Sequence, residues 1–134
     1  MPKVTRWFVK TSFIHLVFAL ILGMLQSLPQ WKMGGWFPSY LHWLVFGWLT
    51  QLIFGIAIWM LPKFSNEKPR GYDWLNWMTY GSLNFGLGLR LVFEPWQLSS
   101  WATGRAWVLI IAAFLQWFAC LIFVGQAWVR VRGR

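Results

Sequence analysis

Four long apolar runs constrain this chain more than any other feature. They cover residues 7–28, 40–61, 74–93 and 106–129. Each is close to the ~20 residues that an α-helix needs to cross ~30 Å of hydrocarbon at about 1.5 Å per residue. The runs lack the strict alternation of apolar and polar residues that is typical of a barrel wall. We therefore predict an all-α fold in which four transmembrane helices form an up-down bundle, joined by short loops.

The composition also favours a membrane protein. The chain has 134 residues, of which 58% are hydrophobic, and only 12 basic and 3 acidic side chains. In soluble domains about a quarter of the residues are charged. Thirteen Trp and twelve Phe are more than a soluble core of this size can hide. We predict one domain, residues 1–134, in a lipid bilayer. The third run is the least certain span, since it holds Asn76, Asn84 and Arg90.

The basic residues are sorted by loop. Nine lie before or at the start of the first run, between the second and third, or after the fourth: Lys3, Arg6, Lys10, Lys63, Lys68, Arg70, Arg130, Arg132 and Arg134. The other three lie towards the opposite side of the membrane: Lys32, Arg90 and Arg105. The positive-inside rule then predicts that both termini are cytoplasmic. This sorting accounts for the net charge of +9 without nucleic acid as a partner.

Each run carries small or polar residues at helical spacing, where we expect the helices to pack. The four stripes are Ser12, His15, Ala19 and Gly23; Gly47, Gln51 and Gly55; Gly81, Asn84 and Gly88; and Ala112, Gln116 and Cys120.

Two histidines lie within the runs and differ in depth. His42 follows Tyr40 by two residues, whereas His15 lies thirteen residues before Leu28. At about 1.5 Å per residue the difference in height is ~16 Å, too much for two axial ligands of one iron. At 100° per residue, Gly47, Gln51 and Gly55 lie about 140–220° around the helix from His42, so His42 is predicted off the packing stripe, near the outer surface.

Ionisable side chains in a membrane span are site candidates. His15 either hydrogen-bonds to a neighbouring helix or ligates a metal or cofactor. His42 is either hydrated at the interface or reaches a cofactor between this bundle and another subunit. Arg90 either snorkels, pairs with Glu94 four residues later, or neutralises an anionic group of a cofactor.

The second and third runs resemble a known family. The residues on which the resemblance rests are His42, Phe46-Gly47, Gln51, Phe54-Gly55 and Leu61-Pro62, then Trp77, Asn84-Phe85-Gly86 and Gly88-Leu89-Arg90. The pattern resembles the N-terminal helices of haem–copper oxidase subunit I, and more closely small four-helix bacterial proteins related to the cbb3-type subunit I. The likeness covers about residues 6–95, with a looser match at Lys10-Thr11, Leu20 and Gly23.

The resemblance implies that His42 is an axial ligand of a low-spin b-type haem and that the protein transfers electrons in a bacterial inner membrane. Arg90 would then face a haem propionate. The chain has only His15 and His42 and cannot build the copper-containing binuclear centre, so oxygen reduction on its own is not expected. The second axial ligand would come from another chain, a non-histidine group or water. A two-fold homodimer would place two His42 side chains at one height.

A second hypothesis is a cofactor-free structural or assembly subunit of a larger respiratory or photosynthetic membrane complex. A proton-coupled transporter is disfavoured, because such proteins rely on a buried carboxylate. The acids of this chain are Glu67, Asp73 and Glu94, all at or near the ends of the runs. No catalytic residue is predicted.

Overall fold

The computed structural model describes residues 1–30, 34–96 and 101–132, and these ranges are mostly helical, with no strand among them. The helices are α1 (Lys3–Gln26), η1 (Gly34–Trp36), α2 (Phe37–His42), η2 (Trp43–Thr50), α3 (Gln51–Met60), α4 (Asp73–Phe93) and α5 (Ala102–Val131). Lys32 and Arg134, which entered the charge comparison, lie outside the described residues.

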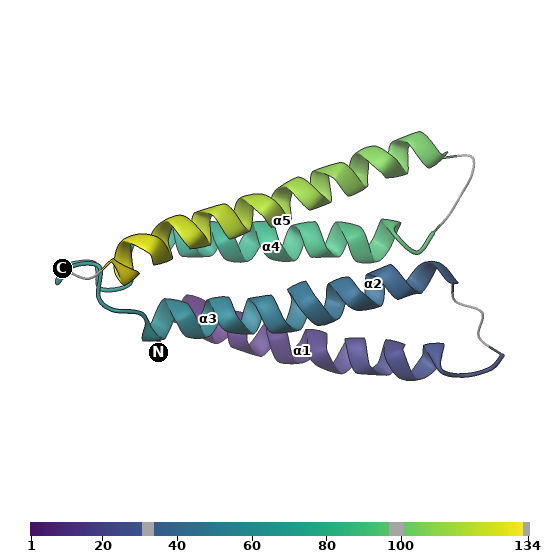
Figure 1. Cartoon of the computed structure of the whole chain (residues 1–134), viewed down its shortest axis with the longest axis horizontal. Coiled ribbons are helices and arrows are strands. Elements are labelled where there is room, and N and C mark those ends of the chain that lie inside the picture. The colour runs from purple at the N-terminus through teal and green to yellow at the C-terminus, as the bar shows by residue number, and fades with distance from the viewer. Residues whose placement is uncertain (31–33, 97–100, 133–134) are drawn as a thin grey trace.

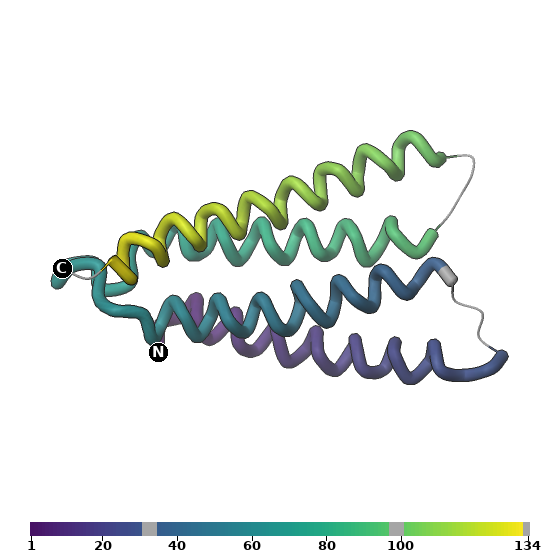
Figure 2. Tube along the Cα trace, in the orientation of Figure 1, coloured from purple at the N-terminus to yellow at the C-terminus, as the bar shows by residue number. Residues whose placement is uncertain are grey.

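The helices form four long rods, because α2, η2 and α3 continue one another. Figure 1 shows them running along the long axis of the molecule as two hairpins. The chain trace in Figure 2 has α1 beside the α2–η2–α3 rod and α4 beside α5, and the contacts between elements agree. We call the end with Lys3, Met60, Asp73 and Val131 the terminal end, and the end with Gln26, Phe37, Phe93 and Ala102 the distal end.

Three of the rods are long and apolar enough to cross a membrane: Lys3–Gln26, Phe37–Met60 and Ala102–Val131. The fourth, α4, has 21 residues and is long enough but less apolar. The four helices coincide with the four predicted runs, although α1 begins at Lys3 instead of residue 7 and α5 begins at Ala102 instead of residue 106. Both extensions carry basic side chains. A boundary drawn from hydropathy leaves such residues out of the run, whereas a helix can include them where its end lies near water.

The outer faces of the bundle are apolar. Large side chains such as Phe13, Val17, Ile110, Phe114 and Trp117 are about half exposed. Inside, Phe8, Leu83 and Ala119 are fully buried, and Phe54 stacks on Phe123 across the hairpins with ring centroids 3.8 Å apart. Apolar groups on both faces of a helix are typical of membrane spans, where lipid covers the outer face.

Small residues mark the packing face on three of the four rods, as predicted. A Cβ added to Gly55 would lie 2.7 Å from the Phe8 Cβ, and one added to Gly47 would lie 2.9 Å from the His15 Cβ. In α1 and α5 most of the predicted residues are buried, although Cys120 is only half-buried.

The predicted stripe on α4 is wrong. Gly81 and Gly88 have no heavy atom within 4 Å of an added Cβ. The close approach is at Gly86, whose Cβ would lie 2.8 Å from the Ala112 carbonyl oxygen. α4 contacts α5 through Gly86 and α1 through Asn84, so it has two contact faces. A single stripe through the polar Asn84 therefore follows the face towards α1 and misses the closer contact of Gly86 with α5.

Gly55 and Gly81 form a matched pair for testing this packing. Gly55→Ala should lower the free energy of unfolding by about 1–3 kcal/mol, because its methyl group overlaps Phe8 and forces the helices apart. Gly81→Ala should change it little, or raise it by up to about 1 kcal/mol through helix propensity. Unfolding in mixed detergent micelles, followed by far-UV circular dichroism, measures both. Equal losses for the two variants would contradict the α1–α3 contact.

Arg130 closes the terminal end of the bundle. Sequence alone places it among the charges of a solvated tail, but the side chain is buried, with 6% exposed. Its Nε donates to the Pro62 carbonyl (2.8 Å), Nη1 to Ile58 (3.1 Å) and Nη2 to Leu61 (2.6 Å). These carbonyls end α3 and have no intrahelical donor. A cation there also complements the negative end of the helix dipole.

Candidate functional site

A cluster of polar side chains joins the two hairpins at the distal end. Its centre is Glu94, directly after α4. Glu94 Oε1 accepts from Arg90 Nη1 (3.0 Å), while Oε2 accepts from His42 Nδ1 (3.0 Å) and Ser39 Oγ (3.2 Å). Ser39 and His42 are three residues apart on α2, so both face the end of α4. We call Ser39, His42, Arg90, Glu94 and Gln116 the distal cluster.

The distal cluster fixes the orientation of the His42 ring. Its Nδ1 lies near two acceptors, Glu94 Oε2 at 3.0 Å and the Pro38 carbonyl at 2.8 Å. Nδ1 therefore acts as the donor, and in the neutral imidazole the lone pair is then on Nε2. The ring stacks on Phe46, and 24% of the side chain is exposed. No residue in the described ranges hydrogen-bonds to Nε2. Metal-ligating histidines commonly have this arrangement, with the second nitrogen held by a carboxylate or carbonyl.

His42 lies away from the glycine face, as predicted, but it is half-buried against α4 and not on the outer surface. Gly47 and Gly55 pack on α1, whereas His42 points to Glu94. The rotation of 100° per residue does not hold here, because η2 is a π-helix. Its i→i+5 hydrogen bonds place more residues in each turn than an α-helix has. The intervening π-helix therefore changes the angle between His42 and the residues beyond it.

Arg90 forms the predicted i,i+4 pair with Glu94, and its Nε donates to Gln116 Oε1 on α5 (3.1 Å). The positive charge of Arg90 is thus paired with the Glu94 carboxylate of the same chain.

Arg105 adds a second cation next to the distal cluster. From the sequence it was interpreted only as a charge of a loop. Its Nη1 donates to the Glu94 carbonyl (3.3 Å), and its buried Nε has no hydrogen-bond partner in the described residues. Glu94 directly follows α4 and Arg105 lies in the first turn of α5, so this contact joins the end of α4 to the start of α5.

His15 has both ring nitrogens occupied. Trp43 Nε1 donates to His15 Nδ1 (2.8 Å), and His15 Nε2 lies 3.3 Å from Asn84 Oδ1. Asn84 is itself oriented, since its Nδ2 donates to the Tyr80 carbonyl (2.8 Å). Of the two alternatives for His15, the structure therefore shows the one in which it hydrogen-bonds to neighbouring helices. These hydrogen bonds link α1, η2 and α4.

The two histidines are closer in height than predicted. Gly23 packs on Tyr40 and Gly47 packs on His15, so His42 lies about five residues, or about 8 Å, from the level of His15. The prediction of ~16 Å assumed that Leu28 and Tyr40 lie at one height. In fact the end of α1 extends past Tyr40 towards the distal end.

No three His, Cys, Asp or Glu side chains converge on one point within the described ranges. A haem iron needs only one or two protein ligands, so the available Nε2 of His42 is the group with ligand chemistry. No family model, no curated protein and no solved structure matches this chain.

Proposed function

We propose that this chain is a small integral membrane protein that binds a b-type haem through His42 Nε2 and transfers electrons. The observation that carries the proposal is the anchored ring of His42: Glu94 and the Pro38 carbonyl hold Nδ1, which leaves Nε2 as a ligand. The resemblance to haem–copper oxidase subunit I assigns the same residue to the same role.

In the proposed topology all four rods cross a bacterial inner membrane, with the terminal end in the cytoplasm. The polar residues of α4, which make it the least apolar rod, have partners inside the bundle. Asn76 bonds to Gln126, Asn84 to His15 and Arg90 to Glu94. The described basic residues of the terminal end outnumber those of the distal end, where Arg90 is paired, and this favours a cytoplasmic terminal end.

The residues around His42 suit a haem in two respects. The Glu94 carboxylate holds the Nδ1 proton, fixes the ring orientation and makes Nε2 a more basic ligand. Arg105 contributes a cation without a carboxylate partner in the described residues, which suits a propionate better than Arg90 does. When bound, the haem supplies a one-electron iron couple.

The second axial ligand would come from outside this chain. Trp43 donates to His15 Nδ1 and Asn84 holds His15 Nε2, so neither ring nitrogen can ligate iron without losing its hydrogen bond. A homodimer with its two-fold axis along the membrane normal would bring a second His42 to the same height. The haem would then lie between two copies, or between this chain and a larger redox subunit.

The two histidines allow a matched test. We expect His42→Ala to lose the haem, measured as haem b per chain after purification in mild detergent. His15→Ala should retain it, although it loses the contacts to Trp43 and Asn84 and about 1–2 kcal/mol of stability. Circular dichroism establishes that both variants are folded. Loss of haem in His15→Ala with retention in His42→Ala would overturn the assignment.

A cofactor-free structural subunit of a larger respiratory or photosynthetic complex is the second candidate. The observation that favours it is the Glu94 carboxylate itself, which contacts Arg90, His42 and Ser39 and so joins the two hairpins without any ligand. Copurification of a haem-free chain with larger redox subunits would support this function over the first.

A further inference from the structure

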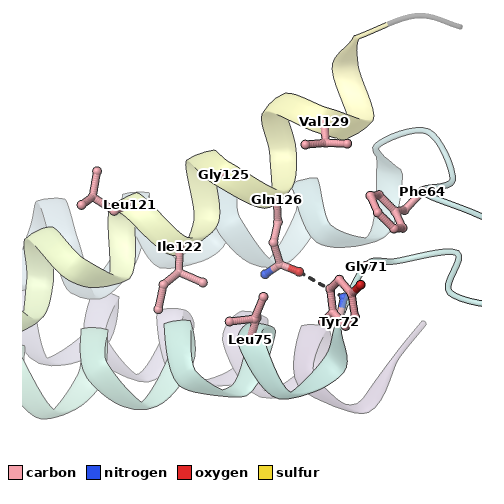
Figure 3. Close-up of a pocket in the computed structure, with 9 residues that line it drawn as sticks. All are labelled: Phe64, Gly71, Tyr72, Leu75, Leu121, Ile122, Gly125, Gln126 and Val129. Atoms are coloured by element: carbon pink, nitrogen blue, oxygen red, sulfur yellow. Dashed lines mark hydrogen bonds between the residues drawn. The ribbon is translucent and has the colours of Figure 1, made fainter.

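A groove and a basic pocket meet at the terminal end of the bundle, far from His42. The groove has a volume of about 370 Å³ and lies between α5, the start of α4 and the connection that precedes α4 (Figure 3). Its walls are mainly apolar and include Leu75, Leu121, Ile122, Gly125 and Val129. The pocket, of about 390 Å³, is lined by Lys63, Ser65, Asn66, Arg130 and Arg132 among others.

The two cavities form one continuous amphiphilic surface. Phe64 and Val129 line both of them. Leu121 precedes Val129 by eight residues, which places the apolar end about 12 Å deeper along α5. The groove therefore runs along the helices, with its polar end at the end of the bundle. A lipid in a bilayer has the same orientation, with its headgroup at the interface and its chains directed inwards.

The polar end has excess positive charge. Arg130 is buried and bonds only to carbonyl groups, and no carboxylate in the described residues lies within 4.0 Å of it. Three of the five guanidinium N–H donors of Arg130 are used, so two remain. A buried cation without a counterion is costly, and a phosphate in the pocket would offset that cost.

We infer that this surface is a binding site for one anionic glycerophospholipid. An acyl chain occupies the apolar groove, and the phosphate headgroup lies among Lys63, Arg130 and Arg132. Basic pockets beside transmembrane helices commonly bind anionic headgroups. The inference depends on a membrane location and not on haem, because His42 lies at the opposite end of the bundle.

Gly125 provides a variant that blocks the groove. An added Cβ there has no heavy atom within 4 Å, so a side chain can start at this position without a clash, and Gly125→Leu is chosen to occupy the groove. Gly81 is equally open and lies outside the groove, so Gly81→Leu is the matched control. For the headgroup, Lys63→Gln with Arg132→Gln removes two pocket charges. Lys3→Gln with Lys10→Gln removes the same charge from exposed positions on α1.

The test is native mass spectrometry of the detergent-solubilised full chain, titrated with phosphatidylglycerol or phosphatidylcholine of matched chains. Phosphatidylglycerol should bind about tenfold more tightly than phosphatidylcholine, and the Lys63/Arg132 variant should lose most of this preference. Gly125→Leu should abolish the bound lipid, whereas both controls bind as the parent does.

Four results would overturn the site. One is equal affinity for the two lipids, and another is unchanged binding in Gly125→Leu. The third is a change of oligomeric state in Gly125→Leu, which would assign the groove to a partner helix. Competition by glycerol 3-phosphate alone would place the affinity in the pocket without the groove and would also overturn it. None of these results depends on the haem content, which the same purified samples report separately.

Discussion

Arg130→Met should destabilise the protein by about 3–5 kcal/mol, the largest effect expected of any single substitution here. The guanidinium donates to three carbonyls at the end of α3, and each contact links α5 to the other hairpin. Methionine fills a similar volume but leaves the carbonyls of Ile58, Leu61 and Pro62 without a donor. Each buried carbonyl that loses its partner costs about 1–3 kcal/mol.

Unfolding in mixed micelles, followed by circular dichroism, measures this loss. Arg132→Met is the matched control, since Arg132 is exposed and two residues away, and we expect a change within about 0.5 kcal/mol. Arg130→Lys should recover only part of the stability, because an ammonium group cannot match the three-point geometry of the guanidinium. Wild-type stability in Arg130→Met would show that the carbonyls find other donors.

Glu94→Ala should have the second largest effect, about 3 kcal/mol. The carboxylate is the shared acceptor of Arg90, His42 and Ser39, and its side chain is only 12% exposed. Removing it leaves the Arg90 charge half-buried without a counterion and leaves the Pro38 carbonyl as the acceptor of His42 Nδ1. In the haem-loaded protein we also expect haem affinity to fall by about 10–100-fold, the usual effect of losing the carboxylate behind a ligating histidine.

A double-mutant cycle separates these contributions. Arg90→Met and Glu94→Ala should couple favourably by about 1–3 kcal/mol, because the double variant no longer holds an unpaired charge. Glu67→Ala is the control, since this acid is exposed in the connection before α4 and should be neutral. Additive losses in the cycle would contradict the ion pair. An unchanged haem affinity in Glu94→Ala would contradict its role behind His42.

The rods and three of their four packing faces were predictable from the sequence for simple reasons. The length of an apolar run is set by the bilayer, and small residues at helical spacing allow close approach. Gly47 and Gly55 illustrate the second rule, because each leaves no room for a Cβ. Gly81 and Gly88 show its limit. A stripe of small residues does not say which neighbour it faces, or whether it faces one at all.

The site was less predictable, because it depends on how the rods are aligned. The spacing of Arg90 and Glu94 indicated their pair, but the contact of Glu94 with His42 requires the end of α4 to lie beside α2. The π-helix η2, which changes the rotation after His42, has no clear signal in WLVFGWLT. Arg105 and Arg130 looked like loop and tail charges, since their acceptors are backbone carbonyls that any sequence supplies.

The central claim is that His42 binds a haem iron. It is tested most directly by the absorbance spectrum of the purified full chain, recorded oxidised and then after reduction with dithionite. We predict a Soret band in the oxidised protein and the sharpened bands of a six-coordinate ferrous b-type haem after reduction, both absent from His42→Ala. A folded, colourless and iron-free protein, in a preparation from cells supplied with haem, would contradict the claim.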